Sequence, residues 1–367
     1  MNQKIHFPGL NGIRAIAAMT VLIFHIDQFL PHFDLKPVFH GPGMAEYAVT
    51  LFFVLSGYLI THLLLLEKEK FQKIDLPKFY IRRILRIWPI YYAVLFIGLL
   101  IFLFLPGSVY LPEGSIIKTF VLYSFLLSNV GYGMGLGIST IMPLWSVGVE
   151  EQFYAFWPLL LNKSKNIIYS LLSVIIIYLL VKVAVHQYCG DGKIYKIIHL
   201  CCFDCMAIGG IGAYLVYTKS KYLRLIYNPF VQLAAWLFLA VSIFHAPVHL
   251  YTIIDNELHA LFYIVIIINV SSNNKTLVNL ENRLFDFIGQ LSYGIYVYHV
   301  TVIVLLSWLM KNVIHYNFTN TSGDYILVFS VIIMLTFVIS FLSYTYFESF
   351  FLRLKNRYAK IESKAWL

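Results

Sequence analysis

The run YILVFSVIIMLTFVISFL, residues 325–342, decides the class of this chain, because it carries no charge and has about the length of a bilayer-spanning helix. A second continuous apolar run, SLLSVIIIYLL, fills residues 170–180. Hydrophobic residues make up 60% of the 367 residues, charged residues 12%, and the mean hydropathy is +0.76. This composition excludes a soluble globular protein, and the continuous runs exclude a β-barrel, whose strands alternate in polarity. We expect an all-α polytopic membrane protein.

About ten segments have the length and polarity of a membrane span. Basic residues concentrate in the loops after the second, fourth, sixth and eighth segments and in the C-terminal tail, whereas the alternate loops are poor in them. Because basic loops stay in the cytoplasm, we expect both termini there. The net charge of +9 is therefore a topology signal, and no nucleic-acid partner is expected. The predicted spans are 12–30, 46–66, 86–105, 143–161, 167–185, 197–217, 229–245, 250–270, 284–310 and 324–348.

The segment near 116–137 is apolar but short, and it runs into a glycine-rich stretch. Counting it as a span would reverse every later loop, so we expect a re-entrant or interfacial segment packed against protein. No linker or repeat divides the chain, which predicts a single membrane domain over 1–367. The first span contains Arg14 and lacks a small-residue cleavage site, so we expect it to be retained.

Arg14 and His25 share the first span, and ionisable groups at membrane depth are costly enough to suggest a function. Eleven residues are close to three helical turns, so both lie on one face, about 16 Å apart along the axis. The plain alternative is an arginine that snorkels at the helix end and a histidine satisfied by a neighbouring helix.

Glu150 and Glu151 lie a few residues inside the fourth span, as His25 lies a few residues from the outer end of the first. We therefore expect them to meet in the outer half of the bilayer. A carboxylate beside an imidazole fixes its tautomer and stabilises its charge, which suits a general base acting on a hydroxyl. The alternative is a buried ion pair that only holds two helices together.

Other polar groups gather on these spans, although each alone could serve helix packing or an aromatic belt. Asp204, beside several glycines, is more typical of structural packing. The cluster Arg82, Arg83 and Arg86 at the cytoplasmic mouth of the third span is either simple anchoring or a phosphate clamp. The candidates for substrate or oxyanion contacts are Ser56, Trp145, Glu151, Tyr293 and His299, and Ser292 and Tyr296 share one side of the ninth span with His299.

Five motifs in order resemble the acyltransferase 3 family. They are Arg14 and His25 with ten residues between them, FFVLSGY at 52–58, RRILRIWP at 82–89, LWSVGVEEQFY at 144–154 and LSYGIYVYH at 291–299. Any one is weak, but together they span nearly the whole chain. The resemblance implies ten helices, a cytoplasmic acyl-CoA donor, usually acetyl-CoA, and a glycan or related acceptor outside the cytoplasm. Glu348 matches the family's terminal glutamate, but Ser349 and Phe350 follow it where a basic residue and proline are common. The chain also ends at Leu367 without room for the extracytoplasmic hydrolase-like domain of some members, so we expect the membrane domain to act alone or with a separate partner.

Metal chemistry is not expected, because the twelve histidines include no His-Glu-x-x-His spacing. Cys201, Cys202 and Cys205 suit a helix interface, although a disulfide from Cys189 would be permitted outside the cytoplasm.

These observations predict an O-acyltransferase integral to the cell (inner, cytoplasmic) membrane. His25 is the expected general base or a transient acyl carrier, Glu150 orients it, and Arg14 with the arginine cluster contacts the donor's phosphates. Acyl-CoA is the expected co-substrate, and a glycan or lipid-linked glycan is the expected acceptor. We expect membrane lipids to surround the protein and no cofactor to be permanently bound. A transporter or flippase that uses the same buried charges as a relay is the alternative from a different class.

Overall fold

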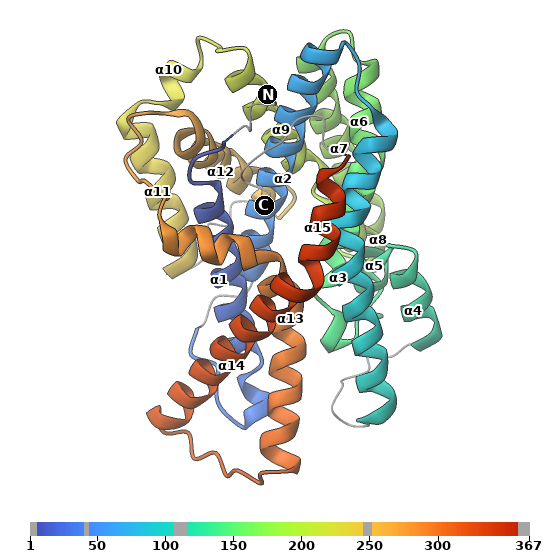
Figure 1. The fold of residues 1–367 in the computed structure, drawn as a ribbon, viewed down its shortest axis with the longest axis vertical. Coiled ribbons are helices and arrows are strands. Elements are labelled where there is room, and N and C mark those ends of the chain that lie inside the picture. Colours follow the sequence, from blue (N-terminus) through green and yellow to red (C-terminus); the bar gives the residue numbers. More distant parts are fainter. Residues whose placement is uncertain (1–5, 40–43, 106–115, 245–251, 359–367) are drawn as a thin grey trace.

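The structure is a computed structural model that describes residues 6–39, 44–105, 116–244 and 252–358. Every regular element in these ranges is helical, which confirms the all-α prediction (Figure 1). Within the described ranges, seven helices are long and apolar enough to cross a membrane. The predicted loop at 245–249 and the end of the basic tail lie outside the described residues.

Five of the seven are α1 Leu10–Gln28, α2 Met44–Phe71, α3 Leu76–Phe104, α7 Ile167–Cys189 and α13 Arg283–Asn312. The sixth is broken at Cys202, a residue of positive φ, into α8 Lys193–Cys201 and α9 Phe203–Tyr217. The seventh continues from α14 Ser322–Leu342 through a π-helical turn, Ser343–Glu348, into α15 Ser349–Asn356.

Three further helices occupy the other predicted spans, namely α6 Leu144–Lys163, α11 Pro229–Phe244 and α12 Asp255–Ser272. Of these, α6 and α12 carry carboxylates, and α11 is short. A short helix, α10 Leu223–Ile226, precedes α11. The count of ten spans therefore stays a prediction.

Helix α3 begins ten residues before the predicted start of the span at 86, so the arginine cluster lies within the helix, and its position at the cytoplasmic mouth of the span stays a prediction. Asp75 forms the N-cap, with its carboxylate accepting from the backbone N–H of Lys78. Pro77 follows in the first turn, where its missing N–H costs nothing. The capping residues, and not the apolar run, thus set where this helix begins.

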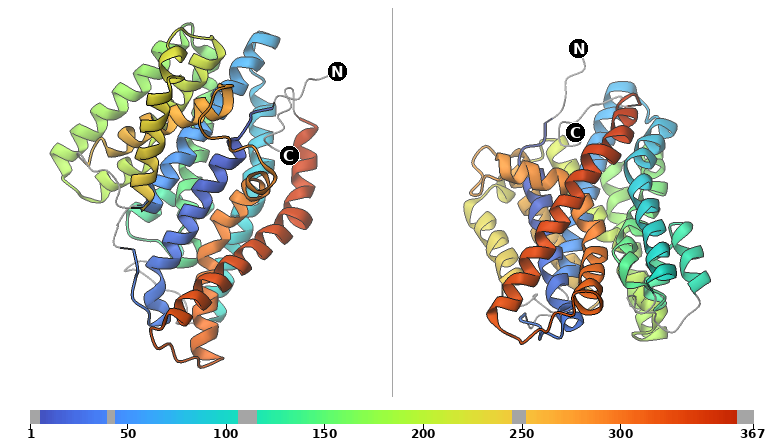
Figure 2. Two further views of the ribbon diagram at one scale, coloured as in Figure 1. Left: turned by 90° about the vertical axis from the view of Figure 1, so that its left-hand side faces the viewer. Right: turned by 60° about the horizontal axis from the view of Figure 1, so that its bottom comes forward.

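The predicted basic loops gather at one end of the bundle, the upper end in Figure 1. There, Lys68 at the end of α2 donates to the carbonyls of Leu161 and Asn162 at the end of α6. At the lower end, the short helix η1 Leu30–Phe33 follows α1, and Lys311 at the end of α13 pairs with Asp34 at 2.8 Å. The described ends of the chain both lie toward the upper end (Figure 2). Which side of a membrane the upper end faces stays a prediction.

The segment near 116–137 forms two short helices, α4 Ile116–Ser124 and α5 Ser128–Gly133, with a break at Leu126, whose φ is positive. A helix of nine residues rises about 13 Å, less than half the thickness of a bilayer's apolar core. A single 3-10 turn, η2 Ser139–Ile141, then leads into α6. The re-entrant or interfacial placement of the segment near 116–137 stays a prediction.

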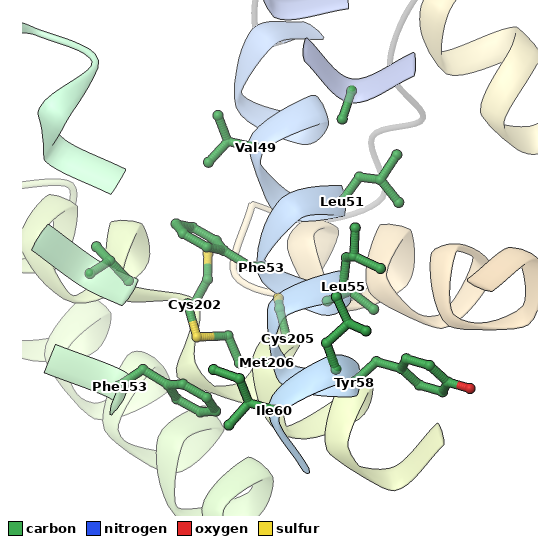
Figure 3. Packing of buried hydrophobic residues seen from close by; sticks show 14 of the residues in the cluster. Val49, Leu51, Phe53, Leu55, Tyr58, Ile60, Phe153, Cys202, Cys205 and Met206 are labelled. Carbon is green, nitrogen blue, oxygen red and sulfur yellow. The ribbon is translucent and has the colours of Figure 1, made fainter. Parts of the chain in front are cut away.

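Helices α2 and α9 cross at the centre of the largest apolar cluster, which includes Phe53, Cys205 and Met206 (Figure 3). Glycines allow their backbones to touch. A Cβ at Gly57 would lie 1.9 Å from the carbonyl oxygen of Met206, and one at Gly209 would lie 2.1 Å from that of Val54. Close backbone approach through small residues is how helices pack in membranes, where no hydrophobic force drives them together.

Candidate active site

A polar cavity of about 80 Å³ lies among α1, α2, α3, α6 and α13. It collects most of the predicted site residues from positions far apart in the chain. Its polar lining consists of Arg14, Ser56, Arg83, Arg86, Ser146, Glu150, Tyr154, Ser292, Tyr293 and Tyr296.

Glu150 is the hydrogen-bonding centre of this cavity. One carboxylate oxygen accepts from the Ser56 hydroxyl at 2.9 Å, and the other accepts from Tyr154 at 3.0 Å. Arg14 and Arg83 attract the same carboxylate. Tyr154 was not among the predicted site residues, although it stands four positions after Glu150 and so shares its helix face.

The arginine cluster divides between two environments. Arg83 and Arg86 line the cavity, and the Arg83 guanidinium lies 5.3 Å from the centre of the Tyr154 ring. Arg82 instead pairs with Glu67 at 3.2 Å and donates to the carbonyl of Tyr358. The sequence could not make this division, because it follows from which face of α3 meets α6 and α13.

Lys355 places a basic side chain in the same region from α15, which packs against α3. It is 8% exposed and is repelled by Arg86, Arg83, Arg14 and Arg82. On the sequence it belonged only to the basic tail. Glu348, in the π-helical turn before α15, attracts Arg86, so this glutamate does reach the cluster despite the unusual residues that follow it.

Two predicted oxyanion candidates have their hydroxyl groups engaged. Ser56 donates to Glu150, and Tyr293 donates to the backbone carbonyl of Ile87 at 3.0 Å. Glu151 accepts from the Trp88 indole at 2.8 Å, and its other oxygen is buried without a hydrogen-bond partner in the described ranges. Trp145 stacks on Tyr132 and so forms part of the cavity's surroundings, not its lining.

His25 pairs with His299, and their hydrogen bonds fix both tautomers. His299 Nδ1 lies 3.1 Å from the carbonyl of Ile295, which can only accept, so Nδ1 carries the proton. In the neutral ring, His299 Nε2 is then an acceptor, and it lies 2.8 Å from His25 Nδ1. His25 Nδ1 must therefore donate, which leaves the lone pair of neutral His25 on Nε2.

The expected contact between His25 and Glu150 is wrong. His25 bonds His299, whereas Glu150 bonds Ser56 and Tyr154. Glu150 shares its cavity with Arg14, whereas His25 lies about 16 Å further along α1. The cause is the start of α6. Leu144 is fully buried, and Ser146 already bonds Tyr296 at 2.6 Å in the middle of α13. Because α6 begins inside the protein, counting residues from an assumed membrane surface misplaced Glu150.

A second buried charge cluster joins α7, α9 and α12. Lys182 Nζ lies 2.8 Å from Asp204 and 2.6 Å from Glu257, and the side chains of Lys182 and Asp204 are 0% exposed. Only Asp204 was singled out from the sequence, although Lys182 and Glu257 are also charges within predicted spans. All four cysteines are free thiols, with Cys189 exposed and the other three buried.

The fold and the cavity define a polytopic helical membrane protein with an arginine-rich internal site. The family model described as "Acyltransferase domain" (Acyl_transf_3) matches residues 7–345. The chain therefore belongs to the acyltransferase 3 family, which confirms the resemblance in the motifs.

The chain is similar to named relatives over part of its length. It is 34% identical over 206 residues to "O-acetyltransferase OatA" of Staphylococcus aureus (strain NCTC 8325 / PS 47), covering 53% of this chain and 32% of that protein. It is also 34% identical over 161 residues to "Peptidoglycan O-acetyltransferase OatA" of Listeria monocytogenes (42% and 24%), and 32% identical over 161 residues to "Putative peptidoglycan O-acetyltransferase YrhL" of Bacillus subtilis (42% and 24%). The matches thus span a third or less of these relatives. No solved structure matches the chain.

Proposed function

We propose that this protein is a membrane O-acetyltransferase that moves an acetyl group from cytoplasmic acetyl-CoA to a hydroxyl of an extracytoplasmic or lipid-linked glycan. The names of its relatives support a peptidoglycan-type acceptor. The observation that carries the proposal is the convergence of Arg14, Arg83 and Arg86 on one internal cavity that also holds Glu150.

The donor's phosphates would be held by the cations at the upper end of the cavity. Guanidinium groups bind phosphate oxygens in pairs of hydrogen bonds, and a polyanion would relieve the repulsion of Arg14 by Arg86 and Arg83. Arg83 and Arg86 are the expected contacts. Arg82, already bonded to Glu67 and Tyr358, is expected to contribute to folding instead.

The thioester would then extend along α1 from Arg14 toward His25, a distance of about 16 Å. An extended pantetheine arm has a length of this order. Tyr296 lines the cavity, and its ring centre lies 6.0 Å from that of His299. The hydrogen-bonded pair of Tyr296 and Ser146 therefore lies between the cavity and the histidine pair, where one hydroxyl could polarise the acetyl carbonyl.

The chemistry requires one base and one proton path. His25 Nε2 would remove the proton from the acceptor hydroxyl while the oxygen attacks the acetyl carbonyl. The C–S bond breaks, an ester C–O bond forms, and the proton ends on the sulfur of free CoA. His299 is a positioning residue in this scheme, because it holds His25 in the tautomer that leaves Nε2 unprotonated. Bringing base, thioester and hydroxyl together supplies much of the remaining rate enhancement.

Donor binding tests the proposal directly. The purified chain in detergent should bind acetyl-CoA and transfer radiolabelled acetyl to a glycan acceptor. Arg83→Met should weaken that binding, while the matched charge deletion Arg82→Met should not. A chain that neither binds nor consumes acetyl-CoA would contradict the proposal and favour the transporter or flippase alternative.

A further inference from the structure

A second pocket, of about 350 Å³, lies toward the lower end of the bundle. The end of α1, η1, the segment between α5 and α6, and the start of α8 line it. This volume is in the lower range of small-molecule sites. Phe29 in its lining stands one turn beyond His25, and Met142 stands one turn before Ser146. The pocket therefore lies next to the layer that holds the proposed base.

Lys196 on α8 is the lysine among the described residues that line this pocket, and no arginine or carboxylate residue is among them. Its ammonium lies 5.1 Å from the centre of the Tyr132 ring, whose ring in turn stacks on Trp145 at 5.6 Å with 14° between the planes. A cation over an aromatic face is held in place without losing its charge. Burial and the nearby Lys311 lower the pKa of His32, so its imidazole stays neutral at pH 7 and can donate or accept.

Ser139, also in the lining, has a buried hydroxyl with no hydrogen-bond partner in the part of the chain that the structure describes. An unpaired buried hydroxyl costs stability unless a ligand or water completes it. The pocket thus offers an oriented cation and a neutral imidazole beside the histidine pair, and the unsatisfied Ser139 hydroxyl lies beneath its surface. This set suits a ligand rich in hydroxyl groups that also carries negative charge.

We infer that the lower pocket receives the acceptor glycan, and that Lys196 gives preference to a sugar unit bearing a carboxylate or a phosphate. This inference rests on the proposed function, since it assigns the second substrate to the opposite side of His25 from the donor. Glu46, which does not line the pocket, attracts Lys196 and moderates this preference. Removal of that carboxylate should therefore strengthen the preference for charged acceptors.

The test compares three soluble acceptors of equal length: a neutral chito-oligosaccharide, its carboxylated counterpart and its phosphorylated counterpart. The full chain is placed in nanodiscs of neutral lipid with saturating acetyl-CoA, and kcat/KM is measured for each acceptor. The wild-type protein should prefer one or both charged acceptors by about three- to tenfold, the range expected for one charge-assisted contact. Lys196→Met should reduce this ratio to near one, mainly through KM.

Lys193→Met is the matched control, because it removes the same charge from the same helix outside the pocket lining. It should keep the preference, and Glu46→Gln should increase it. An unchanged preference in Lys196→Met would overturn the inference. A preference that disappears when anionic lipid is added to the wild-type protein would also overturn it, because Lys196 would then bind lipid headgroups. If the wild-type protein acetylates no acceptor and does not consume acetyl-CoA, the proposed function itself fails.

Discussion

The two buried charge clusters of this protein differ in how completely their charges are enclosed. In the cluster of Lys182, Asp204 and Glu257, one ammonium lies within 2.8 Å of both carboxylates, and Lys182 and Asp204 are sealed from solvent. In the cluster of Arg14, Arg83 and Glu150, the side chains are only half-buried and surround a cavity of about 80 Å³. The first cluster is completed by the protein's own residues, whereas the second has room for a ligand.

This difference indicates that an ionisable group within a membrane helix is not sufficient evidence for a catalytic site. Such groups are costly wherever they occur, and a closed triad can offset that cost by pairing. What distinguishes the site is a cavity lined by several arginines that repel one another while nearby carboxylates attract them. The comparison predicts that mutations in the triad change stability, while mutations around the cavity change activity.

The largest effect on stability should come from Lys182→Met, which leaves two buried carboxylates without their cation. We expect a loss of about 3–5 kcal/mol in unfolding free energy, measured by denaturation in detergent. The triple variant Lys182→Met, Asp204→Asn, Glu257→Gln should recover most of this loss and keep acetyl transfer. A triple variant that folds but is inactive would contradict the assignment of this cluster to folding.

The largest effect on activity should come from His25→Ala. We expect a loss of about 100-fold or more in transfer rate with an unchanged unfolding temperature, because an acid-base group is removed without leaving a buried charge. His299→Gln retains an acceptor for His25 Nδ1–H and should keep more activity than His299→Ala. Equal losses in both His299 variants would argue against the tautomer-fixing role.

Arg83→Met should raise the KM for acetyl-CoA by about tenfold with a smaller effect on kcat, since it removes a binding contact. Arg82→Met should instead lower the unfolding temperature, because it leaves Glu67 buried without its partner. Steady-state kinetics and thermal denaturation of the two variants test this. A higher donor KM in Arg82→Met alone would reverse the division of the cluster.

The smallest effect is expected for Ser56→Ala. Glu150 would lose one of its hydrogen-bond donors but keep Tyr154, so we expect a change in kcat of about two- to tenfold. The double variant Ser56→Ala, Tyr154→Phe should lose far more than the product of the single effects, because the carboxylate then lacks both hydroxyl partners. Strictly additive losses in a double-mutant cycle would show that the two hydroxyls act independently of each other and would contradict their shared role at Glu150.

The sequence predicted the helical class and the positions of the helices well, because long apolar runs directly reflect the lipid environment. It failed where depth depends on packing. The depth of α6 depends on contacts such as Ser146 bonding Tyr296, and the start of α3 on the Asp75 cap, and neither leaves a signal in hydropathy. The pairing of His25 with His299 was also missed, although both residues were candidates, because a contact between distant helices depends on their relative rotation.

The glycine-mediated crossing of α2 and α9 limits how this protein can move. Because the backbones of α2 and α9 touch at Gly57 and Gly209, we expect these two helices to move together and Ser56 on α2 to keep its depth during the reaction cycle. Opening a path for a ligand as long as CoA must therefore come from the opposite wall. There, α3 contains Pro89 one turn beyond Arg86, and α15 is joined to α14 by a π-helical turn. The rigid pair of helices would keep Ser56 in place as a hydrogen-bond donor to Glu150, while the hinged wall admits and releases the donor.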